Sequence, residues 1–346
     1  MINPKRTPKH YTLRISLTSL CNLNCEYCNP VRKVDPSKIM SDKDFFEIIE
    51  SAVYVGIEKI AWTGGEPTIR PNFVGIVKKA KELGINDQRL TTNGVLFHRL
   101  AKQLKKSGLN QVDISLDTLD REEFKKICKV DAFENVIKSI HTAVELFPVT
   151  KINSVFFKSN FHTLDDFVSF IESFKGKLSL RINEIVPCGE IYDKDPTLFD
   201  REFLPVYQIL FKFAQMGKLT PVNNKWDMVK SLYFKIAGKK GIYGVLPNPS
   251  INYKCDEEDC TKIRVSPHGF VSNCTIQMGY LRDFNHTTLE EKKKLMKEIV
   301  AEKMNRDYRG FKHKQKYYDF WRFGIDTGLE SIIENARKRT LLSFKK

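Results

Sequence analysis

A strand pattern and a cysteine cluster meet in the segment Arg14-Ile-Ser-Leu-Thr-Ser-Leu-Cys21-Asn-Leu-Asn-Cys25-Glu-Tyr-Cys28. The apolar residues Leu13, Ile15 and Leu17 alternate with polar ones, which is typical of a half-buried strand. Three cysteines follow at once, separated by three residues and then by two. Such short gaps let one loop place three thiolates around one metal centre. The pattern therefore predicts a strand that leads into a metal-binding loop.

Two kinds of metal centre suit this loop. A [4Fe–4S] cluster usually takes four cysteines, so three ligands would leave one iron open. A structural zinc ion needs a fourth nitrogen or sulfur donor, and the nearest candidates, His10, His98 and Cys128, are not part of the loop. The sequence favours the cluster, with zinc as the alternative.

The spacing of the three cysteines, with an aromatic residue before the last, resembles that of the radical S-adenosylmethionine (SAM) enzymes. The resemblance implies that Cys21, Cys25 and Cys28 hold a [4Fe–4S] cluster whose open iron binds the amino and carboxylate groups of SAM. An electron from the cluster then splits the sulfonium bond and gives a 5′-deoxyadenosyl radical. The cofactor carries this step, and the protein orients it and excludes water.

The composition is that of an ordinary globular protein, with 41% hydrophobic and 29% charged side chains in 346 residues. No apolar run approaches the ~18 residues of a membrane span, and the N-terminus lacks the apolar core of a signal peptide. Cysteines clustered as for metal binding, rather than spaced as for disulfides, indicate a reducing compartment. We expect a cytoplasmic enzyme.

The net charge is +15, from 57 basic and 42 acidic side chains, so the chain suits an anionic partner. Several lysine groups fall in segments with a helical pattern, where a solvated polar face explains them. They are Lys102, Lys105 and Lys106, then Lys125 and Lys126, and Lys292, Lys293 and Lys294. We therefore expect a small phosphorylated ligand rather than nucleic acid.

Strand and helix patterns alternate through the first half of the chain. After the first strand, the expected strands are 58–63, 87–90, 111–116, 150–156 and 178–185, and the expected helices are 42–55, 72–83, 96–107, 132–146 and 163–174. Polar motifs follow the strands at their carboxyl ends, where parallel α/β architectures bind ligands. Six repeats are too few for an eight-stranded barrel. The sequence thus predicts an α/β fold, a partial (β/α)6 TIM-like barrel over 11–217.

The remaining chain is expected to fall into two parts. A helix over 201–216 closes the barrel, residues 218–252 form an irregular connector rich in glycine, proline and asparagine, and residues 253–346 form an auxiliary-cluster region with a helix near 287–304. In that region Cys255, Cys260 and Cys274 make a second triplet.

A strand, a turn and a second strand are predicted over 261–271, which would return Cys274 toward Cys255 and Cys260. His268 would lie at the hairpin tip, ~15–20 Å from its base. An auxiliary [4Fe–4S] cluster is favoured, zinc stays the alternative, and Cys128 and Cys188 are read as unligated thiols.

Two adjacent glycines, Gly64 and Gly65, end the second expected strand and permit close approach of a ligand to the backbone. By resemblance, the Gly-Gly-Glu-Pro motif contacts the amino group of SAM. The cofactor-binding residues that we expect on this basis are Gly64, Gly65, Glu66, Thr92, Asn93 and Ser115.

The second triplet narrows the resemblance to the GTP 3′,8-cyclase family, radical SAM enzymes of molybdenum-cofactor biosynthesis. It runs from about residue 11 to 284, through Leu13–Thr18, Thr63–Pro67, Thr92–Gly94, Ser115–Asp117, Lys151–Asn153, Arg181–Glu184 and the Cys260–Cys274 hairpin. The residues that the resemblance assigns to the substrate are Arg14, Lys59, Lys151, Arg181, Lys262 and Arg264.

The sequence departs from the family pattern at several points. Ala61 stands where the pattern has an arginine two residues before Thr-Gly-Gly, and Lys262 stands where the hairpin begins with arginine. The first gap of the second triplet is four residues rather than two, and the chain ends in Ser343-Phe-Lys-Lys346 instead of Gly-Gly. These departures favour a divergent homologue that acts on another substrate.

The sequence predicts a two-cluster radical SAM enzyme that removes hydrogen from a small phosphorylated substrate, a nucleotide in the first place, and gives a cyclised or rearranged product. We expect an external electron donor, no membrane partner and, as one option, a homodimer. The alternative enzyme is a maturase of a ribosomally made peptide. A zinc-bearing RNA-binding protein would explain the charge, but not Gly-Gly-Glu-Pro behind a three-cysteine loop.

Overall fold

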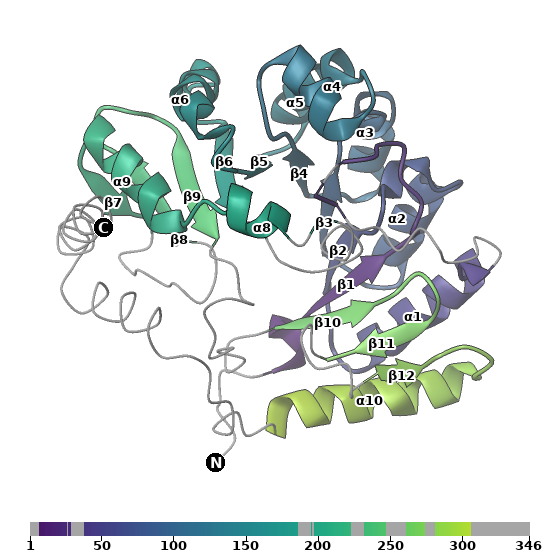
Figure 1. The fold of residues 1–346 in the computed structure, drawn as a ribbon. Helices are drawn as coiled ribbons and strands as arrows, with labels where there is room; N and C mark the ends of the chain where they lie inside the picture. The colour runs from purple at the N-terminus through teal and green to yellow at the C-terminus, as the bar shows by residue number, and fades with distance from the viewer. Residues whose placement is uncertain are drawn as a thin grey trace. The chain divides into compact units, whose positions relative to one another are not determined.

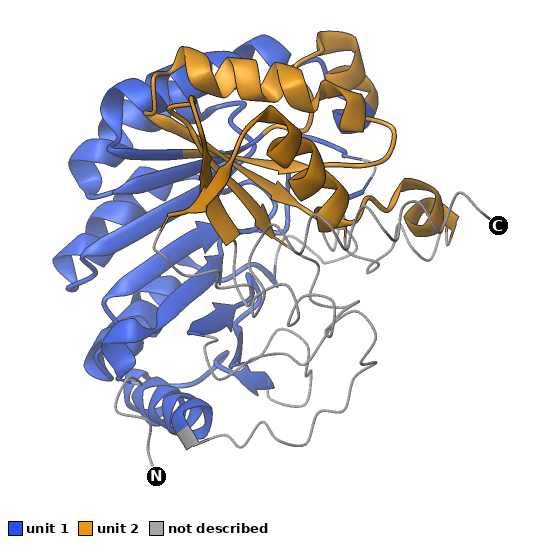
Figure 2. Ribbon diagram, turned by 90° about the vertical axis from the view of Figure 1, so that its left-hand side faces the viewer, with its two compact units in different colours: residues 1–115, 127–150, 260–308 blue, residues 116–126, 151–259, 309–346 orange. Residues whose placement is uncertain are grey.

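The computed structural model describes residues 7–25, 27–28, 38–185, 195, 197–222, 232–246, 261–273 and 281–305. The chain divides into two compact units (Figure 2). Unit 1 comprises residues 1–115, 127–150 and 260–308, and unit 2 comprises residues 116–126, 151–259 and 309–346. The boundaries expected at 217 and 252 stay predictions.

Unit 1 is a mostly parallel sheet with helices (Figure 1). Its strands are β1 (Thr12–Ser16), β2 (Lys59–Thr63), β3 (Asp87–Thr92), β4 (Gln111–Ser115), β10 (Lys262–Val265), β11 (Phe270–Ser272) and β12 (Leu281–Asp283). They lie in the order β12-β11-β10-β1-β2-β3-β4. The run from β10 to β4 is parallel, and β11 and β12 are antiparallel additions. The predicted hairpin after residue 261 is therefore confirmed, and its first strand joins the sheet beside β1.

The helices of unit 1 begin and end close to the residues expected from the sequence. They are α1 (Asp42–Tyr54), α2 (Phe73–Glu82), α3 (Phe97–Ser107), α5 (Phe133–Leu146) and α10 (Leu289–Asn305). Local chemistry sets these limits. The Ser41 hydroxyl accepts a hydrogen bond from the Asp44 N–H and caps α1. Gly108 ends α3 with φ of 110°, a backbone conformation that costs glycine nothing.

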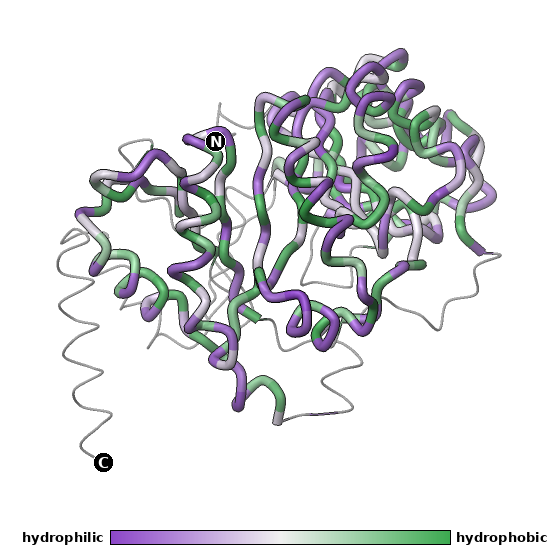
Figure 3. The backbone as a smooth tube through the Cα atoms, turned by 90° about the horizontal axis from the view of Figure 1, so that it is seen from above, coloured by the Kyte–Doolittle hydropathy of each residue, from purple (hydrophilic) through white to green (hydrophobic). Residues whose placement is uncertain are grey.

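Alternation of apolar and polar residues decides which side of each strand is buried. In β1, Leu13 and Ile15 are fully buried, whereas Thr12, Arg14 and Ser16 on the opposite face are only partly covered. Figure 3 shows this mixture of hydrophobic and hydrophilic residues along the elements. The buried faces form the core, and the other faces are left for polar chemistry.

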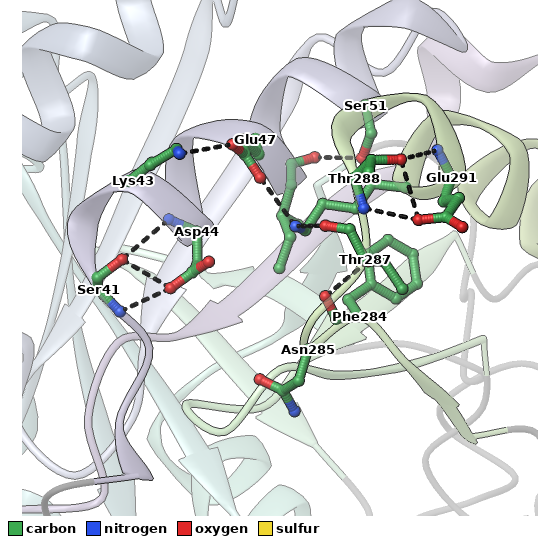
Figure 4. A network of polar contacts seen from close by, with 12 residues as sticks. Ser41, Lys43, Asp44, Glu47, Ser51, Phe284, Asn285, Thr287, Thr288 and Glu291 are labelled. Carbon is green, nitrogen blue, oxygen red and sulfur yellow. Dashed lines mark hydrogen bonds and ion pairs between the residues drawn. The ribbon is translucent and has the colours of Figure 1, made fainter.

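Helix α10 packs against α1 through a buried lysine. Lys292 is 2% exposed, and its Nζ lies 2.8 Å from a carboxylate oxygen of Glu47 and 2.7 Å from the carbonyl oxygen of Thr287. Figure 4 shows the network around Glu47 and Thr287. The prediction that this lysine belongs to a solvated face was wrong, because an ion pair and a carbonyl compensate for its burial. On α3, by contrast, Lys102, Lys105 and Lys106 are exposed as expected.

Unit 2 holds the remaining strands. These are β5 (Val149–Val155, of which residues 151–155 belong to this unit), β6 (Leu178–Asn183), β7 (Leu219–Pro221), β8 (Leu232–Ile236) and β9 (Ile242–Leu246), in the order β5-β6-β9-β8-β7. Strand β9 is parallel to β6, and β8 and β7 are antiparallel. Its helices are α6 (Leu164–Ser173), α8 (Thr197–Glu202) and α9 (Val206–Met216), while α4 (Arg121–Cys128) lies mainly in this unit.

Two predictions in this region were wrong. The single helix expected over 201–216 is divided into α8 and α9, because Pro205 cannot continue a helix and instead stands before α9. The connector expected to be irregular contains β7, β8 and β9. The glycines of this segment suggested irregular structure. In β8, however, apolar and polar residues alternate, and Leu232, Phe234 and Ile236 are buried.

No helix in the described part of the chain is long and apolar enough to cross a membrane. The cytoplasmic location stays a prediction.

Candidate cofactor and anion site

The cysteine loop, residues 17–28, is attached to the Gly-Gly-Glu motif through the backbone. The Gly65 N–H donates to the Thr18 carbonyl at 2.7 Å, and the Glu66 N–H donates to the Leu20 carbonyl at 2.8 Å. These bonds continue the pairing of β1 with β2 beyond the ends of both strands. The motif therefore fixes the start of the loop that carries the cysteines.

This attachment explains why two glycines are needed. A Cβ on Gly65 would lie 2.0 Å from the Leu20 carbonyl oxygen, and a Cβ on Gly64 would lie 2.5 Å from the Thr18 carbonyl oxygen. Gly64 also has φ of 144°, which strains any other residue. The backbone that approaches both glycines in the structure is that of the cysteine loop, and the expected approach of a ligand stays a prediction.

Glu66 is fully buried and ties the end of β2 to the end of β3. One carboxylate oxygen accepts from the Thr68 N–H at 2.9 Å, the Thr68 hydroxyl at 2.6 Å and the Thr92 hydroxyl at 2.7 Å. The other accepts from the Asn93 N–H at 2.6 Å. Burial raises the pKa of Glu66, and these hydrogen bonds oppose the rise. The side chains of Glu66 and Thr92 thus bond to each other, and their expected contact with SAM stays a prediction.

Asn93 links that network to the cysteine loop. Its side-chain amide donates to the Asn22 side-chain oxygen at 2.7 Å and lies 3.6 Å from the Cys21 sulfur. The Leu23 N–H also donates to that sulfur, at 3.4 Å. Burial raises the pKa of the Cys21 thiol, while the donors from Leu23 and Asn93 lower it. Such donors stabilise a thiolate, which is the form that binds metal.

The three cysteines of the loop are thiolate donors of the kind that iron–sulfur clusters take. Cys21 and Cys25 are partly buried and Cys28 is exposed. Within the described residues, no three histidine, cysteine or acidic side chains converge as a single metal ion would require. A cubane does not need such convergence, because each thiolate binds a different iron. The donors fit a cluster with one open iron.

A fourth cysteine lies against the loop. The Cys128 sulfur is 3.6 Å from that of Cys25, and the Asn24 N–H donates to the Cys128 carbonyl. No sequence pattern predicts this contact, because more than a hundred residues separate the two cysteines. The second triplet, Cys255, Cys260 and Cys274, lies outside the described residues, as does Cys188.

Four of the six predicted substrate residues share one sheet face. Lys262 and Lys59 both lie in register with Thr12, and Arg264 lies in register with Arg14. Within the strands, the sequence neighbours of these four residues, Leu13, Ile60 and Ile263 among them, are buried on the opposite side of the sheet. We call Arg14, Lys59, Lys262 and Arg264 the basic face.

The other predicted positions are more dispersed. Lys151 and Arg181 belong to unit 2. The Lys151 ammonium lies 5.1 Å from the ring centre of Tyr233, and the Arg181 Nε is buried without a hydrogen bond among the described residues. Ser115 is half-buried at the end of β4.

Comparison with known proteins shows the family of this chain. Residues 15–171 match the Radical SAM superfamily. A GTP 3′,8-cyclase of Clostridium perfringens (strain SM101 / Type A) is 33% identical over 317 residues, which are 89% of this chain and 94% of the relative. A probable GTP 3′,8-cyclase of Pyrococcus abyssi is 32% identical over 78% of this chain and 86% of its own length.

The fold resembles a crystal structure of Streptococcus suis SuiB bound to S-adenosylmethionine. The TM-score is 0.57 at 16% identity, over 82% of this chain and 65% of SuiB. This likeness and the alternating β/α order confirm the α/β, partial TIM-like barrel fold. Membership of the superfamily implies a [4Fe–4S] cluster and SAM. Because its cyclase relatives are more than 30% identical over most of its length, the chain belongs to the radical SAM superfamily and, within it, to the family of the GTP 3′,8-cyclases.

Proposed function

We propose that this radical SAM enzyme acts on a phosphorylated nucleotide, with GTP as the first candidate, and converts it to a cyclised or rearranged product. When bound, the cluster and SAM supply a 5′-deoxyadenosyl radical that removes a hydrogen atom from the substrate. The names of the cyclase relatives support GTP. An external donor would provide the electron, and the homodimer stays a prediction.

The basic face is the observation that carries this proposal. Arg14 and Arg264 are direct neighbours on adjacent strands, where like charges repel each other. The described strands β10, β1 and β2 place no carboxylate on that face. Several cations on one face of a sheet give that face a positive potential, which attracts an anionic ligand. Arginine grips phosphate through two parallel hydrogen bonds, so a phosphate chain suits this face better than a neutral peptide.

The residues proposed for the cofactors follow from the site. Cys21, Cys25 and Cys28 would hold the SAM cluster at the end of β1. The residues proposed to contact SAM remain Gly64, Gly65, Glu66, Thr92, Asn93 and Ser115. The backbone bonds of Gly65 and Glu66 to the cysteine loop support this proposal, because they hold the motif beside the cysteines.

A second [4Fe–4S] cluster on Cys255, Cys260 and Cys274 is part of the proposal. Lys151 and Arg181 are proposed as further substrate contacts by resemblance. The hairpin β10–β11 supports the second cluster, because it lies between Cys260 and Cys274 in the sequence.

The test is anaerobic reconstitution followed by assay of 5′-deoxyadenosine release with GTP, GMP, guanosine and a neutral peptide. We expect ~8 iron atoms per chain and faster release with GTP than with guanosine. Replacing Cys21, Cys25 and Cys28 by Ala should halve the iron and abolish release. Replacing the second triplet should halve the iron and leave uncoupled release. If the peptide accelerates release and no phosphorylated compound does, the nucleotide proposal is wrong and a peptide maturase takes its place.

A further inference from the structure

The basic face continues from β2 onto the neighbouring strand β3. Strand β3 lies beside β2, with Arg89 in register with Ala61. Gln88 and Leu90, on either side of Arg89, are fully buried, and Gln88 accepts a hydrogen bond from the Trp62 indole N–H. Arg89 must therefore point to the opposite side, which is the side of the basic face.

Three arginines thus occupy one row across four strands. The row reads Arg264, Arg14, Ala61 and Arg89, in the order of β10, β1, β2 and β3. Adjacent strands are ~4.8 Å apart, so the backbones at Arg14 and Arg89 are separated by roughly 10 Å. Ala61, the smallest side chain of the row, lies in register between Arg14 and Arg89.

Asp87 on the same strand already contacts Arg89. Its carboxylate accepts from the Arg89 Nε at 3.1 Å and from Nη2 at 2.8 Å. The Arg89 side chain is nonetheless 49% exposed, and an ion pair that open contributes little to stability. The two hydrogen bonds orient the Arg89 guanidinium group, and about half of the side chain remains accessible to a ligand. Across the four strands the face still carries five cations and one carboxylate.

We propose that Arg89 binds the phosphate chain of the substrate and is a specificity-determining residue of this enzyme. The inference rests on the nucleotide function proposed above and goes beyond it. The arginine that the family pattern carries at position 61 is replaced here by one at 89, one strand further along the sheet. The anion contact is thereby moved by about one strand spacing, ~4.8 Å, toward β3.

Binding to the anaerobically reconstituted full-length protein tests this. Calorimetry with GTP, GMP, guanosine and inorganic tripolyphosphate would be run on the wild type and on Arg89→Ala. One lost charged hydrogen bond predicts ~10- to 100-fold weaker binding of GTP and tripolyphosphate, with guanosine affinity unchanged. Arg89→Lys should lose less than Arg89→Ala. The matched control is Arg99→Ala, which removes an exposed arginine from α3 and should change nothing.

A second variant moves the arginine from position 89 to position 61 and tests whether the row itself binds the anion. The double variant Ala61→Arg/Arg89→Ala should regain tripolyphosphate binding, because the guanidinium returns to the same row. If Arg89→Ala binds GTP and tripolyphosphate as the wild type does, the inference is wrong while the nucleotide function stands. If the wild type binds GTP no better than guanosine, the phosphate face itself is refuted and the role of Arg89 with it.

Discussion

Replacing Glu66 by Gln tests the buried junction between the Gly-Gly-Glu motif and the cysteine loop. The amide oxygen can keep the three hydrogen bonds from Thr68 and Thr92. The new NH2 group must then face the Asn93 N–H, which now bonds to the carboxylate at 2.6 Å. One charge-assisted bond is lost and a buried donor is left unsatisfied.

The magnitude follows from those contacts. Each hydrogen bond to a charged group contributes about 1.5–3 kcal/mol, and the bonds that remain become neutral and weaker. Relief from burying a charge offsets part of the loss. We therefore expect the free energy of unfolding to fall by about 2–4 kcal/mol. Because Asn93 also holds Asn22 in the cysteine loop, reconstitution should give less iron.

Urea unfolding under anaerobic conditions, with iron analysis of the same samples, measures both effects. Glu82→Gln is the matched control, since Glu82 is half-exposed on α2 and, among the residues that the structure describes, pairs with Lys78 and Lys79 on the helix surface. It should behave as the wild type. An unfolding midpoint and iron content for Glu66→Gln equal to those of Glu82→Gln would refute the role assigned to the buried carboxylate.

Three further outcomes are expected. Gly65→Ala should lower iron content and SAM binding, because its Cβ would meet the Leu20 carbonyl at 2.0 Å; equal iron in both proteins would contradict this. Burial raises the pKa of Glu172, but three hydrogen bonds outweigh it and hold that pKa below its usual 4.5. Glu172→Gln should therefore lower stability at pH 7, and the difference in unfolding free energy should shrink as pH falls below 4.5, which thermal unfolding against pH would follow. Lys292→Met should cost about 1–3 kcal/mol, measured in urea, with part regained when Glu47→Gln removes the partner charge.

The sequence alone was sufficient for everything that depends on local pattern. Leu13, Ile15 and Leu17 predicted the first strand, and the helical pattern over 42–55 predicted α1. The cysteine spacing indicated the family, because three thiolates on one short loop have few uses other than a metal centre. Pro205 could have predicted the end of α8, since proline lacks the N–H that a helix interior needs. The strands β8 and β9 were not predicted, because the glycines of that segment suggested an irregular connector.

What only the tertiary structure decided is which distant residues share a face or a contact. Strand pairing brings Arg264, Arg14 and Arg89 into one row, although residues 14 and 264 are far apart in the chain. The same holds for the sulfurs of Cys25 and Cys128, and for the burial of Lys292 against Glu47. Periodicity within one segment fixes the side of a strand on which a residue lies. It carries no information about which strand becomes the neighbour or in what register, because those depend on packing of the whole sheet.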